Sequence, residues 1–561
     1  MTVRSIVIHG HFYQPPREDP WLNQVAAEPS AAPYHDWNER IERESYRAVV
    51  AARVYAPDGR IAHIVNTLAS ISFNFGATLL EWLERETPGT YAAVLEADRA
   101  SRARHAGHGN AIAMPYHHVI MPLASRRDKI TEVRWGIADF RRRFGRGPEG
   151  MWLPETAVDP ETLDVLAAEG IAFTILAPHQ VEQAPADGSA GRYRTSGGRS
   201  IALFVYDGPI SHDVAFGSLL KDASAWAERL LAPGKRGHER RLVAVATDGE
   251  TYGHHHKFGE VALAWVLREL ERRRDARVEN FAAFLARHRP EQEVKLVAPT
   301  SWSCAHGVER WRADCGCRMA PERPTQQRWR APLREALDWL AGELHARFEQ
   351  EGGALFAGSW AARDAYGTDR TGDGRARELL EMERNALRMF TSCGWFFDDI
   401  AGIETIQILR YAARAIELAG ADAPRLEAGV LERLARAQSN ERAEGTGRDV
   451  YRNHVKRRVP VESAARTDAH AADSGDDAAR ALLRAVLALE HDHSPRAIAA
   501  VTELADRAQR DGGHIPFDAQ TAFYRIRAAA PPERAAQLAS VAWRLGFADG
   551  EVEGKGKGGS H

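Results

Sequence analysis

Short apolar runs that alternate with amphipathic segments over the first 300 residues are the feature that most restricts the fold of this chain. Such runs are typical of buried strands, and they occupy residues 5–11, 61–66, 111–116, 170–176, 201–206 and 241–250. Helical periodicity lies between them, for example at residues 76–86 and 129–145. This alternation predicts a parallel α/β domain, either a barrel or a doubly wound sheet. Both folds place their chemistry at the C-terminal ends of the strands.

The pattern changes near residue 330, where the chain becomes rich in Ala, Leu, Arg and Glu with helical spacing. Segments of this kind cover residues 331–350, 377–390, 403–420, 426–438 and 479–492. We therefore predict four parts, which are an α/β domain over 1–300, a connecting segment that contacts substrate over 301–329, a helical domain over 330–545 and a disordered tail over 546–561.

Charge and cysteine content limit the kinds of partner and compartment. The 74 basic and 77 acidic residues give a net charge of −3, so no electrostatic argument favours nucleic acid or an anionic membrane. The chain has no uninterrupted apolar run of about 18 residues and no apolar signal-peptide core at its N-terminus. Its four cysteines are typical of a reducing compartment. We expect a cytoplasmic protein with no nucleic-acid or membrane partner.

The segment "IHGHFYQPPRE" at residues 8–18 carries the first candidate site residues. His9 and His11 have strand spacing, so both side chains point to the same side. With Gln14 they suit either hydrogen bonding to a polar ligand or metal ligation, and the alternative is an ordinary polar loop.

Carboxylates follow two other predicted strands. Glu155 comes after an apolar pair in "GMWLPE", where Trp152 offers a stacking face for a sugar; the alternative is an acid that leads a helix. The strand "LVAVAT" delivers Asp248 and Glu250 at its C-terminal end. Two carboxylates that lie close together have pKa values pushed apart. With Glu155 they supply the pair of carboxyl groups that glycoside hydrolysis needs.

A zinc site is the alternative to a carboxylate pair. His9, His11, Asp248 and the run His254–His256 offer zinc ligands by residue type. However, consecutive histidines point in divergent directions, and the chain has no HExxH motif.

A second possible zinc set lies at residues 304–317, where Cys304, His306, Cys315 and Cys317 are ligands by type. Their spacings lack the two-residue gap of common zinc knuckles. We therefore interpret the segment as a sugar-contacting loop that presents Trp302, His306 and Trp311, and we expect no metal.

The aromatic and acidic segment "TSCGWFFDD" at residues 391–399 interrupts a helical pattern. An aromatic cluster such as this is more often core than site. The adjacent acids nevertheless indicate that the segment reaches the cleft, with Trp395 and Asp398 as its substrate contacts.

Five ordered segments together resemble glycoside hydrolase family 57, and in particular its α-amylase/α-mannosidase-like branch. They are "HGHFYQPPRE", "ISFNFGATLLEWLE", "GMWLPETAVD", "ATDGETYGHH" and "TSCGWFFDD". The resemblance implies an incomplete (β/α)7 barrel followed by a helical region, and activity on an α-glucan or maltooligosaccharide without a cofactor. It implies that Glu155 is the nucleophile and Asp248 the general acid/base of a retaining mechanism, with His9, His11 and Glu250 as substrate-binding residues. We place His254 at the rim of the cleft and expect it to contact substrate.

Three motifs depart from the family pattern. Phe12 and Tyr13 are inserted before Gln14, Ile112 stands where the family has a glutamate, and the fifth motif reads Cys393-Gly394-Trp395 in place of Ser-Asp-Trp. The departures leave the type of enzyme open between amylase, 4-α-glucanotransferase and branching enzyme. A metal-dependent polysaccharide deacetylase and a glycan-binding protein without turnover are the alternatives from other classes.

Overall fold

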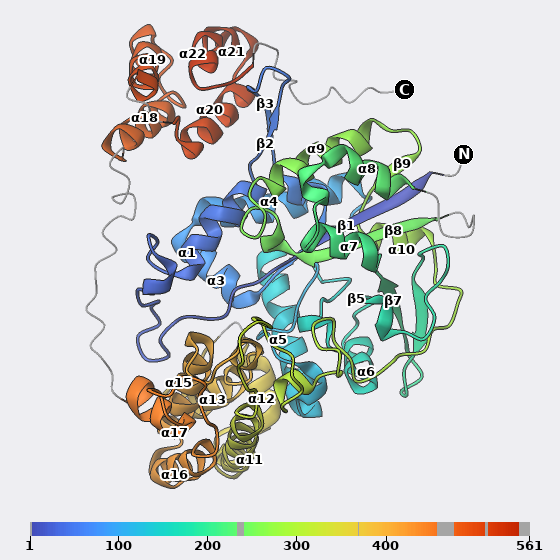
Figure 1. Ribbon diagram of the computed structural model, residues 1–561, viewed down its shortest axis with the longest axis vertical. Coiled ribbons are helices and arrows are strands. Elements are labelled where there is room, and N and C mark those ends of the chain that lie inside the picture. The colour runs from blue at the N-terminus through green and yellow to red at the C-terminus, as the bar shows by residue number, and fades with distance from the viewer. Residues whose placement is uncertain (1–2, 233–239, 368–369, 457–475, 511–513, 549–561) are drawn as a thin grey trace.

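The computed structural model describes residues 3–232, 240–367, 370–456, 476–510 and 514–548 (Figure 1). The strands are β1 (Arg4–Phe12), β2 (Ala52–Tyr55), β3 (Ile61–Val65), β4 (Ser72–Phe75), β5 (Phe173–Leu176), β6 (Gly191–Arg194), β7 (Ser200–Val205), β8 (Leu242–Asp248) and β9 (Ala276–Val278). The helices among them are α1 (Trp37–Ile41), α2 (Arg47–Val49), α3 (Ala77–Glu86), α4 (Pro88–Arg104), α5 (Arg126–Phe144), α6 (Pro160–Ala168), α7 (Gly208–Ala215), α8 (Ala223–Leu231), α9 (Gly259–Arg272) and α10 (Phe281–Arg287).

Parallel pairing continues from strand to strand through the N-terminal domain. β1 pairs in parallel with β8 on one side and with β4 on the other. Single parallel bridges extend the series from β4 through residues 111–113 and 150–151 to β5, which pairs with β7. The amide of Asp207, just after β7, donates to the carbonyl of Ala244 in β8 (2.7 Å). β7, at one end of the series, therefore lies beside β8, at the other end.

The central position of β1 explains its burial. Eight of its nine residues are buried, because neighbouring strands and the side chains of the domain cover it on all sides. The C-terminal ends of β1, β4 and β8 meet at one edge, where His11 pairs with Asn74 in β4 and with Asp248 in β8.

Two of the six predicted strands differ in the structure. The run at 61–66 forms β3, which pairs antiparallel with β2 and lies outside the parallel series. Its Ile61 packs with C-terminal helices instead. The run at 111–116 makes only single bridges. β4, a strand of four residues, was not predicted, because "SFNF" is too short to show periodicity.

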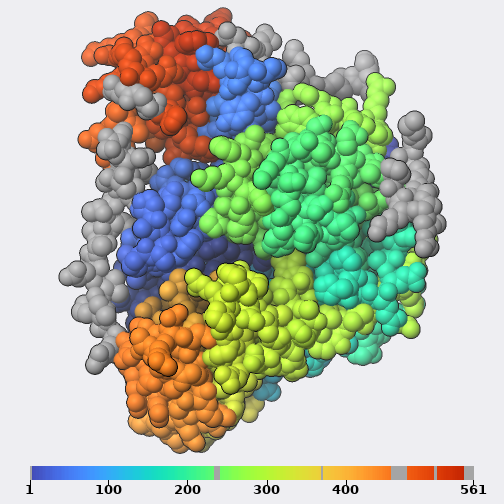
Figure 2. Space-filling view, viewed as in Figure 1, coloured from blue at the N-terminus to red at the C-terminus, as the bar shows by residue number. Residues whose placement is uncertain are grey.

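The C-terminal region is helical, as predicted, but it is divided between two hydrophobic cores at opposite ends of the molecule (Figures 1 and 2). The first core contains α11 (Arg330–Leu355), α12 (Ser359–Tyr366), α13 (Gly374–Arg388), α14 (Cys393–Phe396), α15 (Ile403–Leu418), α16 (Ala423–Leu434) and α17 (Gly447–Val450). The second contains α18 (Asp476–Ala488), α19 (Pro495–Arg510), α20 (Phe517–Ala529), α21 (Pro532–Gln537) and α22 (Ala539–Arg544).

Spacing explains why α11 is central to the first core. Leu333, Leu337, Leu340 and Leu344 recur every three or four residues and are fully buried, so they form one face of the helix. The second core instead includes Phe547, and most of the predicted tail at 546–561 lies outside the described residues. In the described part of the chain, no helix is long and apolar enough to cross a membrane.

Candidate active site

Three carboxylates gather where the parallel segments end. Asp248 is the last residue of β8, and Glu250 lies in the 3₁₀ turn that follows. Glu155 lies in a 3₁₀ turn, Pro154–Thr156, shortly after the bridged residues 150–151. The charges of Glu250 and Glu155 both raise the pKa of Asp248. The three predicted acids are therefore near enough to interact.

Glu155 is held in a specific orientation. Its φ of 57° lies in the left-handed region, which for a residue other than glycine costs on the order of 1–3 kcal/mol and is common at functional sites. The carboxylate accepts hydrogen bonds from the indole nitrogen of Trp302 (3.1 Å) and from the hydroxyl of Ser303. Burial raises the pKa of Glu155, whereas these two donors and the charge of Arg310 oppose that rise by stabilising the carboxylate.

Asp248 has a different environment. Burial raises its pKa well above the usual range, and the neighbouring charges of Glu250 and Glu155 raise it further. Burial also raises the pKa of Tyr206, and Asp248 adds to the rise, which places this phenol beside the acid. The environment of Asp248 therefore favours its protonated form, while Glu155 has donors that favour its ionised form.

Glu250 is tied to the loop that follows β1. Its Oε1 accepts a hydrogen bond from the amide of Tyr13 (3.1 Å) and another from the hydroxyl of Tyr46. Burial raises the pKa of Glu250 to about 7, against the effect of hydrogen bonds that include one from Gln14. The contacts of Glu250 and Gln14 with sugar, as expected from the sequence, stay predictions.

His9 and Trp152, both predicted to contact substrate, have protein partners in the structure. Both ring nitrogens of His9 are engaged, one with Ser72 and the other with Asn74 (3.1 Å each). Trp152 stacks on His9 with ring centroids 4.8 Å apart. Both side chains are 0% exposed, and their predicted contacts with a sugar stay predictions.

His11 lies closer to the opening. It bonds Asn74 (3.3 Å) and the Nε2 of His118 (3.2 Å), and its ring is edge-on to Trp302 at 6.5 Å. Burial lowers the pKa of His9 and His11 to about 3, so both are neutral. Trp302 is only partly buried and contacts Glu155, which suits its predicted role at the site.

Trp395 and Asp398, both predicted to contact substrate, bond other parts of the protein in the structure. Trp395 is 1% exposed in the first helical core and donates to the carbonyl of Arg330 (3.3 Å). Asp398 accepts hydrogen bonds from the amides of Met319 (2.8 Å) and Ala320 (3.0 Å). The aromatic ring is core, and the acid anchors the connecting segment.

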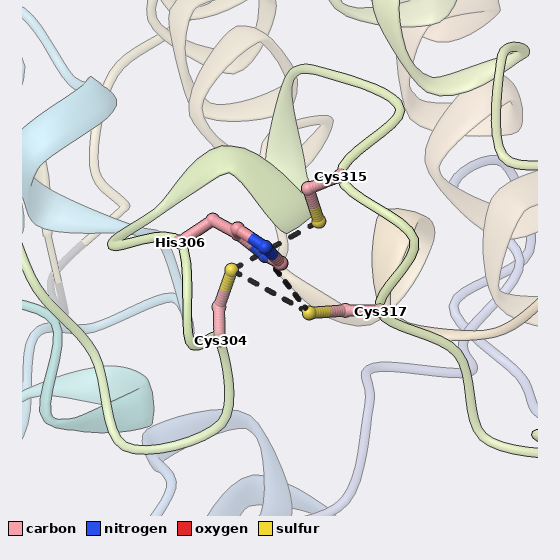
Figure 3. Close-up of side chains that lie close together, drawn as sticks. All are labelled: Cys304, His306, Cys315 and Cys317. Carbon is pink, nitrogen blue, oxygen red and sulfur yellow. Dashed lines mark hydrogen bonds between the residues drawn. The ribbon is translucent and has the colours of Figure 1, made fainter.

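The remaining predicted contacts also have protein partners. His254 hydrogen-bonds Glu44 and lies edge-on to Trp37. Trp311, predicted to contact sugar, is fully buried in the first helical core. His306 lies with three cysteines, Cys304, Cys315 and Cys317 (Figure 3). The loop therefore presents Trp302 and Ser303 to the site, and its other predicted contacts face elsewhere.

The helical region reaches the site through two residues that the sequence interpretation missed. Ser392 bonds His118 through its hydroxyl (2.6 Å) and its amide (2.7 Å). Cys393 lies near Glu155, since burial raises the pKa of its thiol and the charges of Glu404 and Glu155 raise it further. Tyr13 stacks on His118 with centroids 3.9 Å apart. The altered motifs, with Tyr13 inserted and Cys393 in place of serine, were the available signals.

Comparisons with known proteins identify the families that this chain matches. The model of a family described as "Glycosyl hydrolase family 57" matches residues 9–297. The model described as "Domain of unknown function (DUF3536)" matches residues 326–369 and 368–474. Alpha-amylase 1 of Dictyoglomus thermophilum is 25% identical over 106 residues, and the match spans 19% of this chain and only 15% of that relative.

Two solved structures match most of this chain. An exo-type maltose-forming amylase from Pyrococcus sp. ST04 has a TM-score of 0.59 at 16% identity, over 81% of this chain and 88% of the amylase. A branching enzyme from Pyrococcus horikoshii has a TM-score of 0.48 at 16% identity, over 81% of this chain and 94% of the enzyme. At 16% identity the likeness to the amylase is one of fold.

Proposed function

Because the chain belongs to glycosyl hydrolase family 57, we propose that it is a retaining enzyme that acts on α-1,4-linked glucans. The proposal rests on one observation, which is that Glu155 and Asp248 interact but have opposite environments. Glu155 has two hydrogen-bond donors that favour its charge, and Asp248 has two neighbouring acids that favour its proton. A nucleophile and an acid need this division.

Each carboxyl group has two tasks in the proposed reaction. Glu155 attacks the anomeric carbon while Asp248 protonates the departing glycosidic oxygen. Asp248 then removes a proton from water, or from a sugar hydroxyl, as that oxygen attacks the glycosyl-enzyme and releases Glu155. Trp302 and Ser303 hold the carboxylate of Glu155 toward the substrate. Retention requires that the two carboxyl groups lie about 5–5.5 Å apart.

The proposal also covers the barrel fold, the class of substrate and the cellular location. The parallel series from β1 to β8 represents an incomplete (β/α)7 barrel, which would place the three acids at its C-terminal mouth. The substrate is an α-glucan or maltooligosaccharide, and an amylase, a 4-α-glucanotransferase or a branching enzyme all use this chemistry. None of the four cysteines forms a disulfide, which is consistent with a cytoplasmic protein.

Product analysis on maltooligosaccharides and amylose tests the proposal. Wild type should release or transfer glucose units with retention of the anomeric configuration by NMR, and Glu155→Gln and Asp248→Asn should each remove activity. Full activity in either variant would show that the catalytic pair is misassigned. A wild type that binds oligosaccharide but forms no product would instead identify a glycan-binding protein, and chelator-sensitive release of acetate from an acetylated glycan would identify a deacetylase.

A further inference from the structure

Four potential metal ligands converge in the connecting segment. Cys304, His306, Cys315 and Cys317 each offer one ligand atom, and these atoms all lie within 4.8 Å of one another (Figure 3). Among the described residues, this cluster is the one group of at least three His, Cys or acidic side chains that could hold a metal. The family match ends at residue 297, so the cluster lies outside the segment that it covers.

The distances within the cluster agree with one tetrahedral ion. The sulfur of Cys304 lies 4.0 Å from that of Cys315 and 3.9 Å from that of Cys317, whose sulfur lies 3.6 Å from the Nδ1 of His306. Bonds of about 2.3 Å to sulfur and about 2.0 Å to nitrogen place the corners of a zinc tetrahedron about 3.5–3.8 Å apart. A disulfide would leave one cysteine and the histidine without a function, and no two of these sulfurs are bonded.

The surroundings of the sulfurs suit thiolate ligands. Outer partners of a metal ligand orient it and stabilise its charge. The guanidinium of Arg330 donates to the carbonyl of Cys317 (2.8 Å). Three thiolates and a neutral imidazole around Zn²⁺ carry a net charge of −1, and this arginine lies beside them.

We propose that Cys304, His306, Cys315 and Cys317 bind one structural zinc ion, with His306 coordinating through Nδ1. Four protein ligands close the coordination sphere, so the ion has no open position for substrate. Three thiols lose their protons on binding, and the ion holds residues 304–306 against residues 315–317. The sequence argument against zinc relied on the spacing of common knuckles, whereas the fold brings the four side chains together irrespective of that spacing.

The zinc ion would orient the loop that supports Glu155. Cys304 directly follows Trp302 and Ser303, which both donate to the Glu155 carboxylate. On the other side of the loop, Arg310 donates to the carbonyl of Phe396 (2.8 Å) in α14 and stacks on its ring at 3.7 Å. The ion therefore fixes the segment that joins the candidate nucleophile to the helical region.

Metal content of the purified full-length protein tests the site. We expect about one zinc per chain in wild type, measured by inductively coupled plasma mass spectrometry after gel filtration. The double variant Cys304→Ser/Cys317→Ser should retain less than about one tenth of that zinc, because it lacks two of four ligands. His306→Cys should keep the ion, since four cysteines also form a zinc site. Cys393→Ser is the matched control, and its zinc content should equal that of wild type.

A second measurement needs no variant that could fail to fold. Wild type loaded with Co²⁺ in place of zinc should show the sulfur-to-cobalt charge-transfer absorption of a tetrahedral thiolate site, and added Zn²⁺ should abolish it. Folded wild type without stoichiometric metal, stoichiometric iron in place of zinc, or equal zinc in the double variant would each overturn the proposal. These outcomes are independent of the glucan activity, which is read from products.

Discussion

Removal of the Ser303 hydroxyl is the sharpest test of how the site sets the charge of Glu155. Ser303→Ala deletes one of the two side-chain donors to this carboxylate and changes no charge. A hydrogen bond to a charged group contributes about 1.5–3 kcal/mol. Ser303 is only partly buried, so the lower end applies because solvent replaces some of the lost interaction.

The expected shift follows from that energy. One pKa unit corresponds to about 1.4 kcal/mol, so a loss near 1.5 kcal/mol raises the pKa of Glu155 by about one unit. Donors to the carboxylate lower its pKa, so their removal raises it, and a nucleophile must be ionised. The acid limb of kcat/KM should therefore move about one unit to higher pH. At pH values below the acid limbs of both proteins, kcat/KM of Ser303→Ala should be about one tenth of that of wild type.

The assay is the pH profile of kcat/KM for a maltooligosaccharide with a chromogenic leaving group. Ser303→Thr is the matched control, because it keeps the hydroxyl and should keep the acid limb of wild type. An acid limb that stays in place in Ser303→Ala, at any level of activity, would refute the role of this hydrogen bond in ionising Glu155. A uniform loss at every pH would indicate a distorted loop instead.

Three further predictions concern the acid pair and stability. Asp248→Asn should lose at least about 100-fold in kcat on natural glucans but much less on a substrate with a good leaving group. Glu155→Gln should lose activity on both substrates. Equal losses of Asp248→Asn on both substrates would argue against Asp248 as the proton donor. Leu337→Ala should lower the free energy of unfolding by about 2–5 kcal/mol, read as a lower chemical unfolding midpoint, and an unchanged midpoint would contradict the burial of α11. Burial would lower the pKa of His345, but neighbouring carboxylates raise it to about 10. The protonated His345 should therefore stabilise the fold fully below about pH 6.5, and this stabilisation should be lost as the pH rises through 10. The difference in unfolding free energy between wild type and His345→Gln should then narrow with rising pH, and a constant difference would contradict the prediction.

The sequence alone determined the sites of the acids and the change of architecture. Asp248 and Glu155 directly follow apolar segments, and parallel α/β domains gather such positions at one edge whichever strand order they adopt. Helical periodicity after residue 330 likewise predicts helices, because it depends on neighbours within one or two turns. Both inferences use local information.

Which aromatic and ligand side chains face the site was decided only by the tertiary structure. Trp152 and Trp302 are equivalent by residue type, yet Trp152 is fully buried against His9 of β1 and Trp302 bonds Glu155. Trp395 is placed in the core by helices distant in sequence, and the four ligands at 304–317 converge because the loop folds back on itself. Local spacing predicts on which face of its own helix or strand a side chain lies. Its burial and its metal coordination depend on the other segments that pack against that face.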